Sequence, residues 1–112
     1  MAKPLCILGY SGHGYVAIEI FQSTGRRVEA YCDSTEKSSN PFSLRYLGSE
    51  TEVLEQLKRY DYFIATGDNA VRRRVHEFLL PHLGEPANAV HAAATISPSA
   101  TFESGVMVAA GA

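Results

Sequence analysis

A glycine-rich turn near the N-terminus limits the folds open to this chain more than any other feature. The turn follows the apolar run 4–8, which is expected to form a buried strand, and it has glycines at positions 9, 12 and 14. Apolar residues at positions 16, 17, 20 and 21 then recur at the spacing of a helix. A strand, a turn without Cβ atoms and a helix are typical of an α/β fold that binds a phosphate, because the bare backbone can bend sharply and approach the anion.

The helix that starts at this turn would direct unpaired N–H groups and a partial positive charge at a bound anion. His13 lies beside it and could donate a hydrogen bond to the ligand or move a proton. The glycines are spaced G-x-x-G-x-G, which differs from the G-x-G-x-x-G of dinucleotide-binding proteins. The turn could also be a plain tight connection between a strand and a helix, with no ligand.

Length and composition set limits on the class of protein. A chain of 112 residues, 46% of them hydrophobic, can form one small globular domain with a core. Its formal net charge of −2 gives no reason to expect binding to nucleic acid or to an anionic membrane surface. The sequence has neither an apolar run long enough to span a bilayer nor a signal-like N-terminus, so we expect a cytoplasmic protein with no membrane span.

The two cysteines, Cys6 and Cys32, fall within predicted strands. In a cytoplasmic protein, buried free thiols are expected at such positions rather than a disulfide. Neither cysteine belongs to a spacing that is typical of metal ligands, so the sequence predicts no metal site.

The hydrophobic periodicity predicts a Rossmann-like parallel sheet with flanking helices over residues 1–92. Strands are predicted near 4–9, 27–33 and 60–65, and helices near 13–24, 49–58 and 69–80. We expect the first helix to end at Gly25 and the third to stop at Pro81. The second helix is expected to begin with a capping box between Ser49 and Glu52. The aromatic and β-branched residues of the third strand favour a central position, buried on both faces.

Shorter segments complete this prediction. Residues 44–47 are expected to form a short irregular strand, and residues 87–91 a final short strand. The polar segment 34–43 is expected to be a mobile loop at the ligand-facing end of the sheet. Four apolar residues are expected on the buried face of the third helix, namely Val71, Val75, Phe78 and Leu79.

Further polar groups are expected at the carboxyl edge of the sheet, where ligands of such folds bind. Asp33 ends the second strand; an acidic residue there can accept hydrogen bonds from a ribose or a base, and it can equally cap the turn that follows. The segment Thr66–Asn69 forms a second turn between a strand and a helix, with Asp68 or Asn69 as the helix cap. Of three consecutive arginines, Arg72 is expected within a turn of the anion site and the other two in solvent.

The pattern changes towards the C-terminus. Ile96, Phe102 and Val108 recur every six residues, with a small residue four positions after each. This period is that of the hexapeptide repeat, in which each unit forms one side of a left-handed parallel β-helix. Residues 95–112 would form about one coil, which is too little to bury its own apolar edge. We therefore predict that 93–112 is the truncated start of a β-helix and forms an extended tail; the alternative is a chance periodicity in a flexible tail.

Taken together, these motifs resemble one family. They are the turn at 9–14, the strand ending in Asp33, the phrase YFIATGDNAVR at 62–72, and the phrase ISPSA at 96–100 before the hexapeptides. The chain is similar throughout to the NeuD/PglD-like sugar acetyltransferases of bacteria. The resemblance implies a Rossmann-like domain that binds a UDP-sugar, followed by a β-helix that forms a homotrimer and binds acetyl-CoA between subunits. The implied activity, in glycan biosynthesis, is acetylation of an amino or hydroxyl group of the sugar.

The resemblance also implies which residues bind the UDP-sugar. They are Gly9, Ser11, Gly12, His13 and Gly14 in the first turn, Asp33 and Lys37 on the uridine side, and Gly67, Asp68, Asn69 and Arg72 in the second turn. The family usually has Gly-Asn-Asn in the second turn, and the carboxylate of Asp68 fits beside a pyrophosphate only if it points away. The catalytic histidine of the family, a general base, belongs to later coils. We therefore expect no catalytic residue in this chain and no acetyl transfer by the chain alone.

Two other functions are compatible with the residues. A nicotinamide-dependent oxidoreductase would share the Rossmann-like unit, although the glycine spacing and the short chain, which leaves no substrate domain, disfavour it. A non-catalytic module could use the same unit to sense a nucleotide. Binding of NAD in place of UDP-sugars would favour the first alternative, and hexapeptides continuing after Ala112 would favour an enzyme over the second.

Overall fold

A sheet of four parallel strands organises the computed structural model, which describes residues 3–90 and 106–108. In chain order the elements are β1 (Leu5–Leu8), α1 (Gly12–Ser23), β2 (Val28–Cys32), β3 (Arg45–Gly48), α2 (Leu54–Leu57), β4 (Asp61–Ile64), α3 (Asn69–Leu83), β5 (Ala89–Val90) and β6 (Met107–Val108). The strand order of the sheet is β3-β2-β1-β4, and each neighbouring pair is parallel. This arrangement confirms the predicted Rossmann-like fold.

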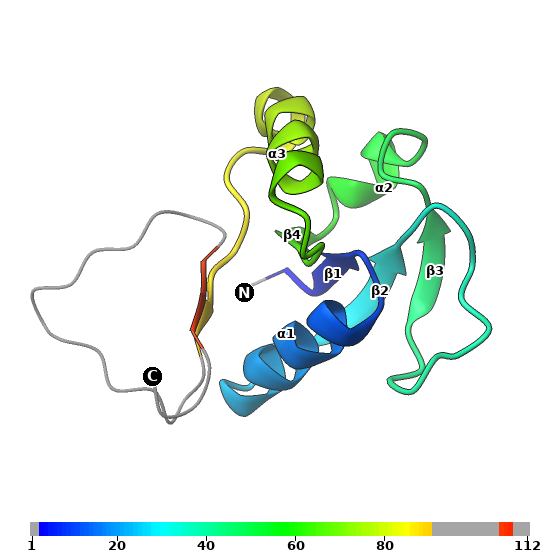
Figure 1. Cartoon of the computed structure of the whole chain (residues 1–112), viewed down its shortest axis with the longest axis vertical. Coiled ribbons are helices and arrows are strands. Elements are labelled where there is room, and N and C mark those ends of the chain that lie inside the picture. Colours follow the sequence, from blue (N-terminus) through cyan, green and yellow to red (C-terminus); the bar gives the residue numbers. More distant parts are fainter. Residues whose placement is uncertain (1–2, 91–105, 109–112) are drawn as a thin grey trace, which may run out of the picture.

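Helices cover both faces of this sheet (Figure 1). Side chains alternate along β1, so that Leu5 and Ile7 pack toward α1 on one face. Cys6 and Leu8 pack toward α2 and α3 on the other face. All four side chains are buried. A strand that is covered on both faces needs apolar residues at consecutive positions, which explains the unbroken apolar run of β1.

The two cysteines lie on neighbouring strands and are free, as predicted. Their Sγ atoms are 3.8 Å apart in a hydrogen bond, and both side chains are completely buried. The hydrogen bond with Cys32, together with burial, raises the pKa of the Cys6 thiol well above its usual value. The Cys6 side chain is therefore a protonated thiol inside the core.

The strand β4 lies at the edge of the sheet as far as the structure describes it, so the predicted central position is wrong. Its side chains from Tyr62 to Ile64 are nevertheless buried on both faces, as predicted. The outer side of β4 is covered by the segment after α3, where the Ala87 N–H donates to the Tyr62 carbonyl over 2.8 Å. The aromatic and β-branched residues of a strand predict that it is buried. An edge strand that another segment covers is as buried as a central strand.

The helix α1 ends as predicted, whereas α2 does not begin as predicted. Gly25 follows α1 with a φ of 76°, and its N–H donates to the Gln22 carbonyl in the hydrogen-bond pattern of a glycine cap. The helix α2 starts only at Leu54. The Ser49 hydroxyl donates instead to the Glu52 carboxylate over 2.7 Å, so the two side chains bind each other rather than the backbone of a helix. The predicted capping box is therefore wrong.

The helix α3 continues through Pro81 to Leu83, beyond its predicted stop. Proline has a helical φ, and near the end of a helix its missing N–H removes a single hydrogen bond. Of the four side chains predicted to be buried, Leu79 is buried, but Phe78 is 38% exposed. The helix packs at the edge of the sheet, next to β4, so a narrower apolar stripe than predicted is covered (Figure 1).

Two short strands, β5 and β6, form a separate parallel pair. Ala89 pairs with Met107, and Val90 pairs with Val108. The strand predicted over 87–91 is confirmed at β5, and the irregular strand predicted over 44–47 is confirmed at β3. The tail is extended at β6, as predicted; its residues 95–105 and 109–112, with Ile96 and Phe102, lie outside the described part of the chain.

Candidate functional site

The carboxyl ends of β1, β2 and β4 meet at one edge of the sheet, where both predicted turns lie. Backbone hydrogen bonds join these ends. The Gly9 N–H donates to the Cys32 carbonyl over 2.9 Å, and the Ala65 N–H donates to the Leu8 carbonyl over 2.8 Å. The chain leaves β1 for α1 on one face and leaves β4 for α3 on the other (Figure 1). Ligands of open α/β sheets bind where neighbouring connections diverge in this way.

The glycines of the two turns fall into two groups. Gly9 has a φ of 100°, and a Cβ on Gly14 would lie 2.4 Å from the Gly9 carbonyl oxygen. These two glycines therefore let the start of α1 approach the end of β1. Gly12 and Gly67 are exposed, and a Cβ on either would meet no atom of the described structure within 4 Å beyond its immediate surroundings in the chain. The turns are thus tight on their inner side and open on their outer side, where a ligand could reach the backbone.

The two helices that begin at this edge differ in how their first N–H groups are satisfied. At α1, Ser11 has an extended backbone, and its side chain makes no capping hydrogen bond. At α3, the Asp68 carboxylate accepts a hydrogen bond from the Val71 N–H over 3.0 Å, which confirms Asp68 as the cap. A side-chain cap occupies N–H groups that would otherwise be open to an anion. The start of α1 is therefore the better anion site of the two.

His13 belongs to the first turn of α1 and is partly buried. Its Nε2 atom is buried and has no hydrogen-bond partner within the part of the chain that the structure describes. A buried polar atom without a partner destabilises the folded state, and a ligand that supplies the partner removes this cost. His13 is therefore a candidate for direct contact with a ligand bound at this turn.

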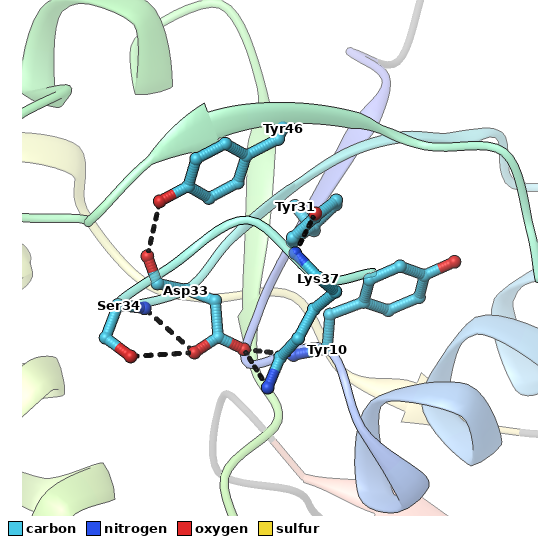
Figure 2. Close-up of polar contacts among 6 residues, drawn as sticks. All are labelled: Tyr10, Tyr31, Asp33, Ser34, Lys37 and Tyr46. Carbon is cyan, nitrogen blue, oxygen red and sulfur yellow. Dashed lines mark hydrogen bonds and ion pairs between the residues drawn. The ribbon is translucent and has the colours of Figure 1, made fainter. Parts of the chain in front are cut away.

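Asp33 lies at the centre of the polar contacts after β2 (Figure 2). Its Oδ2 atom accepts a hydrogen bond from the Tyr10 N–H over 3.0 Å and lies 3.5 Å from the Lys37 Nζ. Its Oδ1 atom accepts a hydrogen bond from the Ser34 N–H over 2.8 Å. The carboxylate thus caps the turn after β2 and also ties it to the glycine-rich turn. Lys37, whose side chain is 36% exposed, places a cation at the same edge.

The second turn is held by contacts among its own residues. The Arg72 guanidinium donates to the Asn69 Oδ1 over 2.6 Å. Arg72 is partly buried, whereas Arg73 and Arg74 are exposed, as expected for the run of three arginines. The first turn lies against the end of β4, because a Cβ on Gly9 would be 3.4 Å from the backbone of the residue before the second turn. The structure therefore brings both predicted groups of site residues to one edge.

Three tyrosines at this edge were not predicted as part of the site. Their rings form a row, with centroids 4.4 Å apart between Tyr10 and Tyr31 and 5.1 Å apart between Tyr31 and Tyr46. Tyr10 follows β1, whereas Tyr31 and Tyr46 lie opposite each other on β2 and β3. From its place in a strand, Tyr31 could have been predicted to be buried. The contact among the three rings could not, since it requires knowing which strands are neighbours.

The hydroxyl groups of this tyrosine row bind the polar segment after β2. The Tyr46 hydroxyl donates to the Asp33 carbonyl over 3.1 Å, and the Tyr31 hydroxyl accepts a hydrogen bond from the Lys37 N–H over 2.9 Å (Figure 2). A backbone group that binds a hydroxyl on a buried ring is fixed relative to the core. The first part of the segment is thus attached at two points.

Tyr10 attaches the second part of the same segment. Its hydroxyl donates to the Asn40 Oδ1 over 2.6 Å and accepts a hydrogen bond from the Phe42 N–H over 3.0 Å. Burial raises the pKa of Tyr10, so its hydroxyl stays protonated at neutral pH and can donate. The segment 34–43 is a loop, as predicted, and tyrosine hydroxyls bind it at Lys37, Asn40 and Phe42; its mobility stays a prediction.

Neither a membrane-spanning helix nor a metal centre is found in the described part of the chain. No helix there combines the length and the apolar character needed to cross a membrane. No group of three or more His, Cys, Asp or Glu side chains there is arranged to hold a metal ion.

Comparison with known proteins places this geometry in a family. Residues 4–79 match the family model of the PglD N-terminal domain. The chain belongs to this family. The match includes both turns and Asp33, so every residue predicted for the site lies inside it. The resemblance to NeuD/PglD-like sugar acetyltransferases that the sequence suggested is thereby confirmed.

Solved structures similar to the chain come from sugar acetyltransferases. A point mutant of perosamine N-acetyltransferase from Caulobacter crescentus, in complex with CoA and GDP-perosamine, is 30% identical with a TM-score of 0.86, over 96% of this chain and 52% of that one. The acetyltransferase domain of PglB from Neisseria gonorrhoeae, in complex with acetyl coenzyme A, is 28% identical with a TM-score of 0.85, over 98% of this chain and 54% of that one. The chain thus spans about half the length of the structures that it matches.

Proposed function

We propose that this chain binds a nucleotide-activated sugar, which is the acceptor of an acetyl-CoA-dependent acetyltransferase. The observation that carries the proposal is the uncapped start of α1 beside open space at Gly12, at the sheet edge where ligands of this fold bind. The class of ligand is supported by the similar perosamine N-acetyltransferase, whose structure holds GDP-perosamine and CoA. The pyrophosphate of such a sugar is an anion that suits the N-terminus of a helix.

The first turn would bind the pyrophosphate. The N–H groups of Gly12, His13 and Gly14 would donate to phosphate oxygens, and the Ser11 hydroxyl, which makes no cap hydrogen bond, would add another donor. The imidazole of His13 would pair its buried Nε2 with a polar atom of the ligand. Gly9 would act indirectly, because its φ of 100° shapes the turn.

The nucleoside would lie on the β2 side of this turn. Lys37 would supply the positive charge there, and Asp33 would hold both Lys37 and the backbone of the turn in place. We propose UDP as the nucleotide, as the sequence resemblance implies. GDP is the alternative nucleotide, because the similar perosamine N-acetyltransferase was solved with GDP-perosamine.

The second turn would frame the ligand from the β4 side. Gly67 leaves open space there, and the Arg72–Asn69 pair offers a cation and an amide. The Asp68 Oδ1 atom already accepts the Val71 N–H, so we propose that Asp68 shapes the turn and does not contact the pyrophosphate. With its carboxylate bound to the backbone of α3, Asp68 would not be directed at a pyrophosphate beside the turn.

Residues from β5 onward would begin a left-handed β-helix. The β5–β6 pairs join residues 18 positions apart (89 with 107), which is the length of three hexapeptides. In the sequence, Val90 also falls in the six-residue series of Ile96, Phe102 and Val108. We therefore propose that the domain boundary predicted between 92 and 93 lies before Ala89. In the whole protein this β-helix would form the homotrimer and bind acetyl-CoA.

The reaction of the whole protein would transfer the acetyl group of acetyl-CoA to an amino or hydroxyl group of the sugar. A bond forms from the acceptor nitrogen or oxygen to the acetyl carbon, the bond from that carbon to sulfur breaks, and a base takes the proton of the acceptor. We assign no catalytic role to the residues that the structure describes; they bind and orient the acceptor. The cytoplasmic location stays a prediction.

Titration calorimetry with UDP, GDP and NAD tests the proposal. We expect heat of binding with UDP and with UDP-sugars, and none with NAD. Gly12→Val should abolish binding, because a branched side chain would fill the space through which the phosphate reaches the helix. Gln22→Val, at an exposed position of the same helix, is the matched control and should bind as the wild type does.

Two results would contradict the proposal. Tight binding of NAD without any response to UDP or GDP would favour an oxidoreductase-like function. Acetyl transfer to a UDP-sugar by this chain alone would show that the division between binding and catalysis is wrong.

A further inference from the structure

We propose that the tyrosine row positions Lys37 for the ligand, which makes Tyr31 a positioning residue of the site. This inference rests on the proposed binding of a nucleotide-sugar. It concerns how the cation at the β2 side of the site is held, and it assigns a role to a buried hydroxyl that packing alone does not require. The inference is carried by the contacts that lead from the Tyr31 ring to the glycine-rich turn.

The rings of Tyr10 and Tyr31 are each only 1% exposed and belong to the core beneath α1. A phenylalanine would fill the same volume at either position. A buried hydroxyl destabilises the protein unless it finds a hydrogen-bond partner. In both residues that partner lies in the segment after β2, so the hydroxyl groups connect the core to this segment and serve no neighbour inside the core.

The contact of Tyr31 is made with the backbone of Lys37. Its hydroxyl accepts the Lys37 N–H over 2.9 Å, and the Lys37 side chain returns to within 3.5 Å of the Asp33 carboxylate (Figure 2). The same carboxylate oxygen accepts the Tyr10 N–H from the glycine-rich turn over 3.0 Å. The position of the Lys37 cation relative to that turn is therefore set from both sides, through its backbone and through its side chain.

A cation held in this way binds an anionic ligand with a smaller loss of conformational freedom. Lysine side chains have several rotatable bonds, and ordering them on binding weakens affinity. The ion pair with Asp33 keeps the ammonium close to the glycine-rich turn, and because the side chain is partly exposed, a phosphate or a base can reach it. The Tyr31 hydroxyl keeps the backbone that carries it at a constant distance from the turn.

A double-mutant cycle with UDP and GDP as probes tests this inference. Dissociation constants are measured by calorimetry for the wild type, Tyr31→Phe, Lys37→Met and the double variant. We expect Tyr31→Phe to weaken binding roughly 3- to 10-fold, the size typical of one lost hydrogen bond. In the Lys37→Met background the same substitution should have no further effect, because Tyr31 acts through the lysine.

Tyr62→Phe is the matched control. It removes another hydroxyl from a buried ring, whose hydrogen bond to the Gly84 carbonyl is 2.6 Å long, in the core cluster on the other face of the sheet. This variant should lose stability and keep the wild-type affinity. Amide hydrogen exchange at Lys37 adds a readout without ligand: it should become faster in Tyr31→Phe and stay unchanged in Tyr62→Phe.

The outcomes separate this inference from the proposed function. A wild-type chain that binds neither UDP nor GDP would overturn both. Normal binding by the wild type together with an unchanged affinity in Tyr31→Phe would overturn the inference alone. An equal loss from Tyr31→Phe in both lysine backgrounds would also overturn it, because the hydroxyl would then act on general stability and not through Lys37.

Discussion

Gly14 is the residue at which the glycine-rich turn tolerates change least. A Cβ there would lie 2.4 Å from the backbone oxygen of Gly9, and a backbone atom cannot move aside as a side chain can. We expect Gly14→Ala to lower the free energy of unfolding by about 1–3 kcal/mol, the usual effect of forcing atoms into a filled space. Urea unfolding followed by circular dichroism measures this difference.

Gly12→Ala is the control for this prediction, since Gly12 is in the same helical turn and has open space around its Cβ position. Its stability should equal or slightly exceed that of the wild type, because alanine favours a helix more than glycine does. Equal stability of the two alanine variants would contradict the close approach of α1 to β1.

At the scale of elements, α3 packs against the sheet through Leu79, Val75 and Leu83, and a hydrogen bond joins the residue after its end to β4. Asp68 caps its start, and after its end the Tyr62 hydroxyl donates to the Gly84 carbonyl over 2.6 Å. Between these points, Leu79 is the helix residue that is fully buried. Tyr62 therefore joins the edge strand β4 to the segment that leads from α3 to β5, and its protonated hydroxyl is part of that attachment.

This attachment predicts a loss of stability at alkaline pH. Burial, with the nearby Glu85 carboxylate, raises the pKa of Tyr62 from 10.0 to about 12. Below pH 10 the hydroxyl is protonated in both the folded and the unfolded chain, so its contribution is complete. Between pH 10 and 12 only the unfolded chain releases this proton, and the free energy of unfolding falls by up to about 1.4 kcal/mol per pH unit.

Urea unfolding between pH 9 and pH 12 tests this prediction by comparing the wild type with Tyr62→Phe. The variant lacks this ionisation, so its stability should start lower at pH 9 and fall less steeply above pH 10. The other tyrosines titrate in both proteins, and the difference between the two slopes therefore isolates Tyr62. Identical slopes would show that Tyr62 ionises equally in the folded and unfolded chain.

At the scale of the whole molecule, the cysteine pair reports on the opening of the core. Cys6 and Cys32 are 0% exposed and lie on β1 and β2, the two inner strands of the sheet. A thiol reagent such as 5,5′-dithiobis(2-nitrobenzoate) needs an exposed thiolate, and both burial and the raised pKa of Cys6 oppose this. We expect no fast reaction in the native chain and two reactive thiols after denaturation.

Because both thiols lie in one core, they should react together, at a rate that rises with urea as global opening does. The reaction is followed by absorbance, with the urea-unfolded chain as the reference for complete reaction. Fast modification of a single thiol in the native chain would show that one inner strand opens independently of the other.

The elements and both turns of the site could be predicted because their signals are local. The apolar run of β1, the glycines of the first turn and the cap at Asp68 each depend on residues a few positions apart. The role of Asp33 was predicted only as two alternatives. The structure shows that Asp33 caps the following turn at the Ser34 N–H and also binds the Tyr10 N–H, 23 positions away; its contact with a ligand stays a prediction.

The sequence by itself determined the parallel α/β fold, the family and the positions that meet at the carboxyl edge of the sheet. The tertiary structure alone decided that β4 lies at the edge of the sheet in the described part of the chain, that α3 passes through Pro81, and that the tyrosine row holds the segment after β2. The periodicity of hydrophobic residues indicates which side chains are buried, because buried positions recur regularly along a single helix or strand. Which buried group meets which partner depends on how distant elements pack, and no short stretch of sequence contains that information.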